Sequence, residues 1–212
     1  LTHASQIELV QFHPSFSYED FMEGLRPVLD GNGTAQLTLQ NGVFKEFCRN
    51  AGQWEIDVCG LGLDRDWELI TIDELRPHRE KLSGDHWQYI FEISDSSKLV
   101  SDAVPPFFFI IDEVNRAELS RVFGELMYCL EYRGIKGSVK TQYANLNNEG
   151  TGMLQTDQGY LFFIPTNIYL IGTMNTIDRS VESFDFALRR GFRWEEVTPD
   201  TGLLRYHLNQ FC

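Results

Sequence analysis

Two adjacent carboxylates, Asp112 and Glu113, directly follow a continuous apolar run, FFFII at residues 107–111. The run is too short for a helix, and its lack of alternation predicts a strand buried on both faces of a parallel sheet. In open α/β sheets, ligands bind at the carboxyl ends of the strands. One carboxylate there can hold a hydrated Mg²⁺, and the next can polarise an attacking water. The alternative is a strand end whose charges simply reach solvent.

Polar residues after a second apolar stretch favour the chemical interpretation. Residues 168–173 are followed by Asn175, whose amide can hydrogen-bond the same water or a terminal phosphate without adding negative charge. Arg189 and Arg190 come later, with Arg193 nearby, and guanidinium groups are natural partners of phosphoryl oxygens. Taken alone, the asparagine is typical of a turn and the arginines of a solvated surface. Beside the paired carboxylates they indicate phosphoryl transfer, with the carboxylates in a Walker B arrangement.

The elements that would position these residues alternate between strands and helices. Residues 7–12 predict a strand, and residues 117–131 predict an amphipathic helix because their apolar residues recur at helical spacing. This alternation favours an α/β fold with a largely parallel sheet sandwiched by helices. Weaker signals predict a helical turn entered at Ser17 or Tyr18, a strand over 35–39, a helix capped by Asn41 and running through Cys48, strands over 54–58, 87–93 and 161–164, a loop with a hairpin over 133–159, and a short helix over 184–188.

The chain has ordinary globular composition and an acidic surface. Of its 212 residues, 42% are hydrophobic and 23% are charged, which is typical of globular proteins. The 18 basic and 31 acidic residues give a net charge of -13. Such a surface repels phosphate backbones and anionic lipid headgroups. A general nucleic-acid coat protein is therefore excluded, although local contact with DNA is not.

Cysteine and histidine spacing argues against zinc and disulfide scaffolds. Cys48, Cys59, Cys129 and Cys212 form no C-x-x-C pair, and the five histidines have no H-x-x-x-H spacing. We therefore expect free thiols in a reducing cytoplasm. No secretory signal opens the chain, and no apolar stretch approaches the ~20 residues of a membrane helix. A membrane partner is not expected.

Three blocks resemble the AAA+ motor domain of McrB-type proteins, the NTP-hydrolysing subunits of modified-cytosine-specific restriction systems. They are QFHPSFSYEDFMEGLRP at 11–27, FFIIDEVNRAELSRVFGEL at 108–126 and YLIGTMNTIDRSVESFDFALRRGF at 169–192. The resemblance implies a P-loop-NTPase-like AAA+ core. Residues 1–212 would then form a partial AAA+ domain, from its second strand through its arginine-finger region. Residues 52–103, which match none of the blocks, would be a family-variable insertion.

The resemblance also implies roles for individual residues. Asp112 corresponds to the Walker B carboxylate associated with Mg²⁺, and Glu113 to the residue that activates water. Asn175 falls at the sensor 1 position. Arg189 and Arg190 fall where AAA+ proteins carry the arginine finger that acts on a neighbouring subunit, and either can be the finger. Four further residues lie in family-typical strings and are expected to order the nucleotide site or the subunit interface: Asn115, Arg116, Asp178 and Arg179.

Two parts of such a domain do not occur in these residues. There is no G-x-x-x-x-G-K-[S/T] P-loop, the loop whose backbone amides and lysine hold the phosphates. Because the family places it before the first block, we expect it upstream of Leu1. The helical lid is expected to be largely absent after Phe192, so the domain is predicted to be incomplete at both ends.

The predicted function is Mg²⁺-dependent hydrolysis of GTP or ATP by a cytoplasmic ring of subunits. The resemblance implies that hydrolysis serves DNA restriction with a nuclease subunit of a McrC-like type, and that DNA is contacted through another domain or the assembled complex. The alternative is a non-hydrolysing assembly or regulatory module, which an upstream P-loop would argue against. A metal hydrolase built on Asp112 and Glu113 alone ranks lowest because it needs further ligands.

Overall fold

A computed structural model describes residues 6–29, 31, 33–59, 71–75, 106–157, 159–175 and 191–198. The strand expected over 87–93 and the helix expected over 184–188 lie outside the described residues. The strands are β1 (Ile7–Gln11), β2 (Glu23–Leu29), β3 (Ala35–Asn41), β4 (Phe107–Asp112), β5 (Leu154–Thr156), β6 (Gly159–Leu161) and β7 (Ile168–Gly172). The helices are α1 (Tyr18–Phe21), α2 (Val43–Cys59), α3 (Ile72–Leu75), α6 (Leu119–Phe123) and α7 (Leu126–Glu131), with 3₁₀ turns η4 (Val114–Arg116), η5 (Ile135–Gly137) and η6 (Ala144–Leu146).

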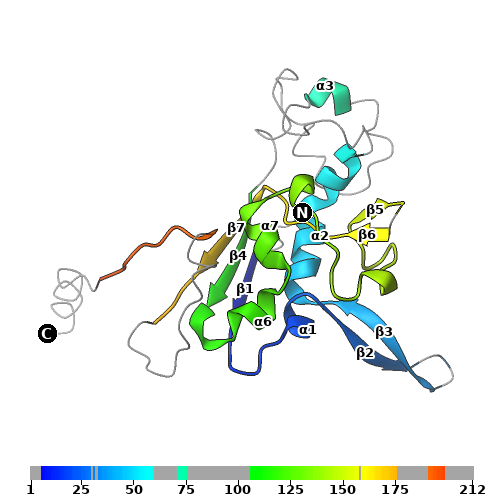
Figure 1. Cartoon of the computed structure of the whole chain (residues 1–212), viewed down its shortest axis with the longest axis horizontal. Coiled ribbons are helices and arrows are strands. Elements are labelled where there is room, and N and C mark those ends of the chain that lie inside the picture. Colours follow the sequence, from blue (N-terminus) through cyan, green and yellow to red (C-terminus); the bar gives the residue numbers. More distant parts are fainter. Residues whose placement is uncertain are drawn as a thin grey trace, which may run out of the picture.

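Among the described residues, three parallel strands form the central sheet, in the order β1-β4-β7 (Figure 1). Ile111 of β4, the middle strand, pairs with Val10 on one side and Gly172 on the other. Parallel neighbours need crossover connections; α2 lies in the one between β1 and β4, and α6 and α7 in the one between β4 and β7. The predicted α/β fold, with a parallel sheet flanked by helices, is confirmed.

The two faces of this sheet have different surroundings. Phe107, Phe109 and Ile111 of β4 are fully buried, and rings of α2 pack on this face, with Phe44 4.9 Å and Phe47 5.2 Å from Phe109. Within the described part of the chain, the core therefore lies against this face. The opposite face carries exposed Ile7 and Leu9 of β1, exposed Tyr169 and Ile171 of β7, and partly buried Phe108 and Ile110 between them.

Helix α1 begins with a capping box, as expected for a helical turn after Ser17. The Ser17 side chain accepts from the Asp20 backbone N–H, and the Asp20 carboxylate accepts from the Ser17 N–H. The helix buries Tyr18 and Phe21, and the Phe21 ring stacks on Phe44 at 4.6 Å. A four-residue helix is thereby fastened to the core.

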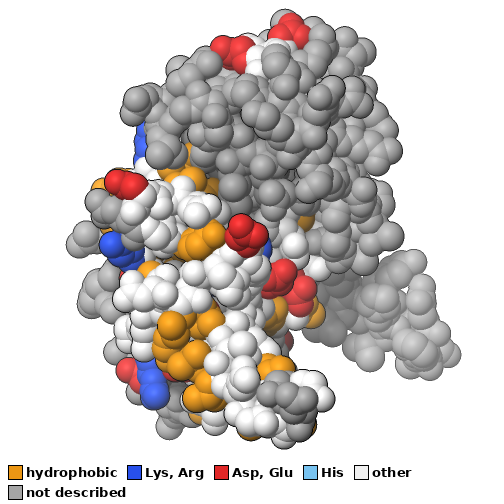
Figure 2. All heavy atoms as spheres, turned by 90° about the vertical axis from the view of Figure 1, so that its right-hand side faces the viewer, with side chains coloured by type: hydrophobic (Ala, Val, Ile, Leu, Met, Phe, Trp, Pro, Cys, Tyr) orange, Lys and Arg blue, Asp and Glu red, His pale blue; other side chains and the backbone are white. Residues whose placement is uncertain are grey.

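An antiparallel hairpin, β2–β3, projects from the body (Figure 1). The strand expected over 35–39 is confirmed as β3, whereas β2 was not predicted. One hairpin face is apolar, since Leu25 pairs with Leu39 and Pro27 with Leu37. Leu37 is 67% exposed. Figure 2 accordingly shows hydrophobic side chains gathered low on the molecule, where the hairpin faces the viewer.

Three predictions of local structure need correction. Asn41 ends β3, and its side-chain amide donates to Glu46 at 2.8 Å while its side-chain oxygen has no partner among the described residues, so it is not a helix cap. The strand predicted over 54–58 is wrong because α2 continues through it. Extending an existing helix costs less than starting a new element. The single helix predicted over 117–131 is two helices, broken at Gly124, whose φ of 48° favours glycine.

A buried ion pair between Lys45 of α2 and Glu23 of β2 anchors the loop at residues 141–148 to the core. Asn147 Oδ1 accepts from Lys45 Nζ at 2.6 Å, and Asn147 Nδ2 donates to Glu23 Oε2 at 3.2 Å. The Tyr143 backbone N–H donates to Glu23 Oε1 at 3.0 Å. Burial by itself raises the pKa of Glu23. Hydrogen bonds and the Lys45 charge together lower it by more, so the pKa of Glu23 lies below its ordinary value.

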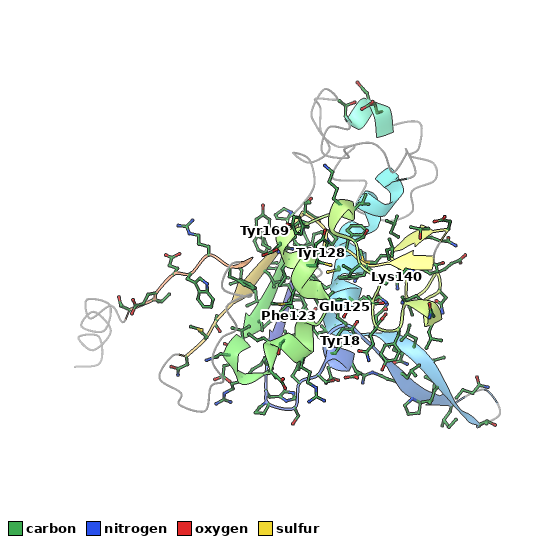
Figure 3. The ribbon with its side chains drawn as sticks, in the orientation of Figure 1. Tyr18, Phe123, Glu125, Tyr128, Lys140 and Tyr169 are labelled. Atoms are coloured by element: carbon green, nitrogen blue, oxygen red, sulfur yellow. The ribbon has the colours of Figure 1, made fainter. Side chains whose placement is uncertain are left out.

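A second polar contact fastens the same loop to α1. The Tyr18 hydroxyl donates to Glu125 Oε1 at 2.5 Å. The Gln142 backbone N–H donates to the Tyr18 hydroxyl oxygen at 3.3 Å and to Glu125 Oε1 at 3.2 Å. Figure 3 places Tyr18 and Glu125 close together at the junction of α1 with the α6–α7 turn. Burial, together with the Glu125 carboxylate, raises the pKa of Tyr18, which therefore stays a neutral donor.

The described cysteines and helices relate to the expected thiols and to the expectation that no helix crosses a membrane. Cys48 and Cys129 are buried thiols, and burial raises the pKa of Cys129 to about 12. Cys129 is therefore a neutral core side chain at physiological pH. No helix in the part of the chain that the structure describes is both long and apolar enough to cross a membrane.

Candidate functional site

Three side chains form a row across the carboxyl ends of the central strands. Gln11 of β1 is the register partner of Asp112. On the other side of β4, Ile111 pairs with Gly172, so Thr173 follows at the level of Asp112. Paired residues of parallel strands point to the same face of a sheet. Gln11, Asp112 and Thr173 therefore lie side by side, on the face opposite the core.

Asp112 is held from both neighbouring strands. Thr173 Oγ1 donates to Asp112 Oδ1 at 2.5 Å, and Gln11 Nε2 donates to Asp112 Oδ2 at 3.4 Å. The strand pairing continues to this point, since the Phe12 N–H donates to the Asp112 carbonyl at 2.9 Å. The carboxylate is thus oriented at a partly exposed strand end.

Glu113 leaves the strand in the left-handed conformation, with φ 53° and ψ 45°. It is the one non-glycine residue with positive φ among those that the structure describes. Such a conformation costs ~1–3 kcal/mol and persists only where the surroundings impose it. Here the Glu113 N–H donates to Thr173 Oγ1 at 3.3 Å, and the Val114 N–H donates to the Thr173 carbonyl at 2.9 Å.

The Glu113 carboxylate contacts two side chains. Arg116 Nε lies 3.0 Å from Glu113 Oε2, and Gln11 Nε2 lies 3.5 Å from the same oxygen. The Glu113 side chain is 27% exposed and that of Arg116 43%, so solvent screens this ion pair and keeps it weak. Gln11 therefore bridges the two carboxylates, while Arg116 orients one of them.

The remaining predicted residues divide into two groups. Asn115 is buried, and its Nδ2 donates to the Asn175 carbonyl at 3.3 Å. The structure thus brings Asn115, Arg116 and Asn175 to the strand ends that carry the two carboxylates. Four others lie outside the described residues: Asp178, Arg179, Arg189 and Arg190.

Comparison with known proteins decides the family. Residues 1–192 match the AAA domain (dynein-related subfamily). The chain belongs to this family. The Type IV methyl-directed restriction enzyme EcoKMcrB subunit of Escherichia coli (strain K12) is 32% identical over 196 residues. The match covers 92% of this AAA chain and 29% of that relative. The resemblance to a McrB-type AAA+ domain is confirmed, over a minor part of the relative's length.

The strand-end residues of this AAA domain fit a hydrated Mg²⁺. Asp112 offers carboxylate oxygens, the ligand type that Mg²⁺ prefers. Among the described residues, no group of three or more His, Cys, Asp or Glu side chains could hold a metal ion. Mg²⁺ commonly uses one or two carboxylates and takes its other ligands from water and substrate phosphates.

Two site residues of the AAA domain, Gln11 and Thr173, were not predicted from the sequence. Each lies at the carboxyl end of a predicted strand, as Asp112 does, but neither is charged. Aligning the ends of the three predicted strands would have placed them beside Asp112, because carboxyl ends of parallel strands share one edge of a sheet.

Proposed function

We propose that this chain is part of a Mg²⁺-dependent AAA+ motor that hydrolyses GTP or ATP. One observation carries the proposal: Asp112 and Glu113 follow the middle strand, and side chains from both neighbouring strands hold them. They lie where open α/β sheets bind their ligands. Membership of the AAA family supports the same conclusion.

In this proposal the residues act by positioning and charge stabilisation. Asp112 holds Mg²⁺, which, when bound, neutralises charge on the transferring phosphoryl group. Glu113 polarises the attacking water, and Asn175, as sensor 1, orients that water or the terminal phosphate. Arg189 or Arg190 reaches the phosphate bound by the neighbouring subunit and stabilises charge there.

Four further residues are proposed to order the nucleotide site or the subunit interface. For Asn115 and Arg116, contacts with Asn175 and Glu113 support this role. For Asp178 and Arg179 the role rests on the resemblance alone.

We also propose that the motor works as a ring in a cytoplasmic DNA restriction system, with a nuclease subunit of a McrC-like type. Similarity to a restriction enzyme subunit supports this. The net charge of -13 favours contact with DNA through another part of the assembly. Residues 52–103 remain a proposed family-variable insertion.

Replacing Glu113 by glutamine in the full-length protein tests the proposal. The amide keeps the side-chain shape but cannot polarise water. We expect turnover to fall on the order of 10²-fold or more while nucleotide binding is retained. Steady-state hydrolysis and equilibrium binding of GTP and ATP measure the two effects.

Glu118→Gln is the matched control, because Glu118 is exposed and lies beyond the strand end; its turnover should be near normal. Near-normal turnover of the Glu113 variant would overturn the assignment. A full-length protein that hydrolyses neither nucleotide would instead favour the non-hydrolysing assembly module.

A further inference from the structure

Thr173, which directly follows β7, contacts both carboxylate-bearing residues. Its Oγ1 lies 2.5 Å from Asp112 Oδ1 and 3.3 Å from the Glu113 backbone nitrogen. A hydroxyl has one hydrogen to donate and lone pairs to accept with. It donates to the Asp112 carboxylate and accepts from the Glu113 N–H. One hydroxyl thus links the strand-end carboxylate to the left-handed turn that follows it.

The Thr173 backbone is fixed from both sides of the same turn. Its N–H donates to the Ile111 carbonyl at 2.9 Å, and its carbonyl accepts from the Val114 N–H at 2.9 Å. Threonine is β-branched, which restricts rotation about χ1. The position of the hydroxyl is therefore set by the sheet rather than by a free side chain.

The other Asp112 oxygen is held less tightly. Gln11 Nε2 lies 3.4 Å from Asp112 Oδ2, a long contact compared with the one that Thr173 makes. A cation can replace such a contact at little cost, whereas Oδ1 stays engaged. The geometry therefore leaves Oδ2 as the oxygen of Asp112 that is more readily available to a metal.

We propose that Thr173 is a positioning residue that orients Asp112 for the metal–nucleotide complex. The inference rests on the proposed function, since it takes Asp112 as the residue that holds Mg²⁺. Hydrogen-bond partners that orient a metal-ligating group are typically worth 10- to 100-fold in metal affinity. We expect a loss of roughly that size when the Thr173 hydroxyl is removed.

The test measures Mn²⁺ affinity, with Mn²⁺ replacing Mg²⁺ as a paramagnetic probe. The full-length protein is titrated with Mn²⁺ in the presence of the imido analogue of GTP, and separately of ATP, and bound Mn²⁺ is followed by electron paramagnetic resonance. The variants are Thr173→Val, which keeps the shape without the hydroxyl, and Thr173→Ser, which keeps the hydroxyl. Thr38→Val is the matched control, because Thr38 is exposed on the hairpin. Asp112→Asn is the reference.

The valine variant should bind Mn²⁺ roughly 10- to 100-fold more weakly, with an unfolding temperature close to that of the parent. The serine and Thr38 variants should bind Mn²⁺ with an affinity close to that of the parent. If the valine variant does not fold, Thr173→Ala replaces it and is expected to show the same loss.

Unchanged Mn²⁺ affinity after removal of the hydroxyl, beside a clear loss in Asp112→Asn, would overturn this inference alone. Unchanged affinity in Asp112→Asn as well would overturn the metal assignment and the inference with it. Equal losses in the serine and valine variants would also count against a role for the hydroxyl.

Discussion

Replacing Lys45 by methionine should loosen the loop that carries Tyr143 and Asn147. Methionine keeps an unbranched apolar stem but removes the charge. Glu23, fully buried, would retain its bonds from Tyr143 and Asn147 and lose its cation. Breaking a buried pair from one side costs ~3–5 kcal/mol. Since 1.4 kcal/mol is a factor of ten, backbone amides of the loop should exchange with solvent about 10²-fold faster or more.

Hydrogen exchange followed by mass spectrometry on the full-length protein measures this loosening, in peptides covering residues 141–148. Lys140→Met is the control, because Lys140 is exposed just before the loop (Figure 3). The double variant Glu23→Gln, Lys45→Met should recover part of the protection, since a neutral amide needs no buried counter-charge. Exchange that is unchanged in Lys45→Met would refute the anchoring role of the pair.

The same pair should make the loop sensitive to acid. The pKa of Glu23 is lower in the folded chain than its ordinary value. Its contribution to stability is therefore fully present above that ordinary value and is lost as pH falls through the folded-state pKa. Loop protection in the parent should accordingly decline in acid, and that part of the decline should be absent from the double variant.

Three further predictions test the site and the fold. Asp112→Ala should raise the Mg²⁺ concentration that half-saturates hydrolysis, and an unchanged Mg²⁺ requirement would separate Asp112 from the metal. Arg189→Ala or Arg190→Ala, mixed with Glu113→Gln subunits, should regain hydrolysis at hybrid interfaces. Because an arginine finger is worth roughly 10³-fold or more in rate, even a minority of restored interfaces should be measurable, and co-assembly without recovery would exclude action on a neighbour. Gly124→Ala should lower the unfolding temperature, since alanine is strained at a φ of 48°; an unchanged temperature would show that the turn adapts.

The central sheet could be predicted because its strands carry strong local signals. Phe107 to Ile111 is too short for a helix and forms the predicted strand, but the prediction that it is buried on both faces is wrong, because Phe108 and Ile110 are only partly buried. Ser17 with Asp20 forms the predicted helical start. β2 escaped prediction because Pro27 and Gly24 argue against a strand, whereas here they lie in a projecting two-stranded hairpin. Residues 54–58 alternate like a strand but continue a helix that had already begun.

The candidate site could be predicted where charge marked it. Asp112 and Glu113 stand out because carboxylates rarely end an apolar strand. Gln11 and Thr173 do not stand out, since a glutamine and a threonine are unremarkable in any strand. Their importance comes from register, a property of strand pairing that no single stretch of sequence contains.

The contacts between Gln11, Asp112 and Thr173 at the strand ends form only when the central sheet is complete. Gln11 and Asp112 are 101 positions apart in the chain, and Asp112 and Thr173 are 61 apart. Parallel strands cannot pair through a hairpin, so each contact requires a long connection to be closed first. Contacts of this kind form slowly and late in folding. A partly folded chain would carry both carboxylates but would lack the contacts of Gln11 and Thr173 with Asp112, so the geometry around Asp112 arises only with the finished sheet.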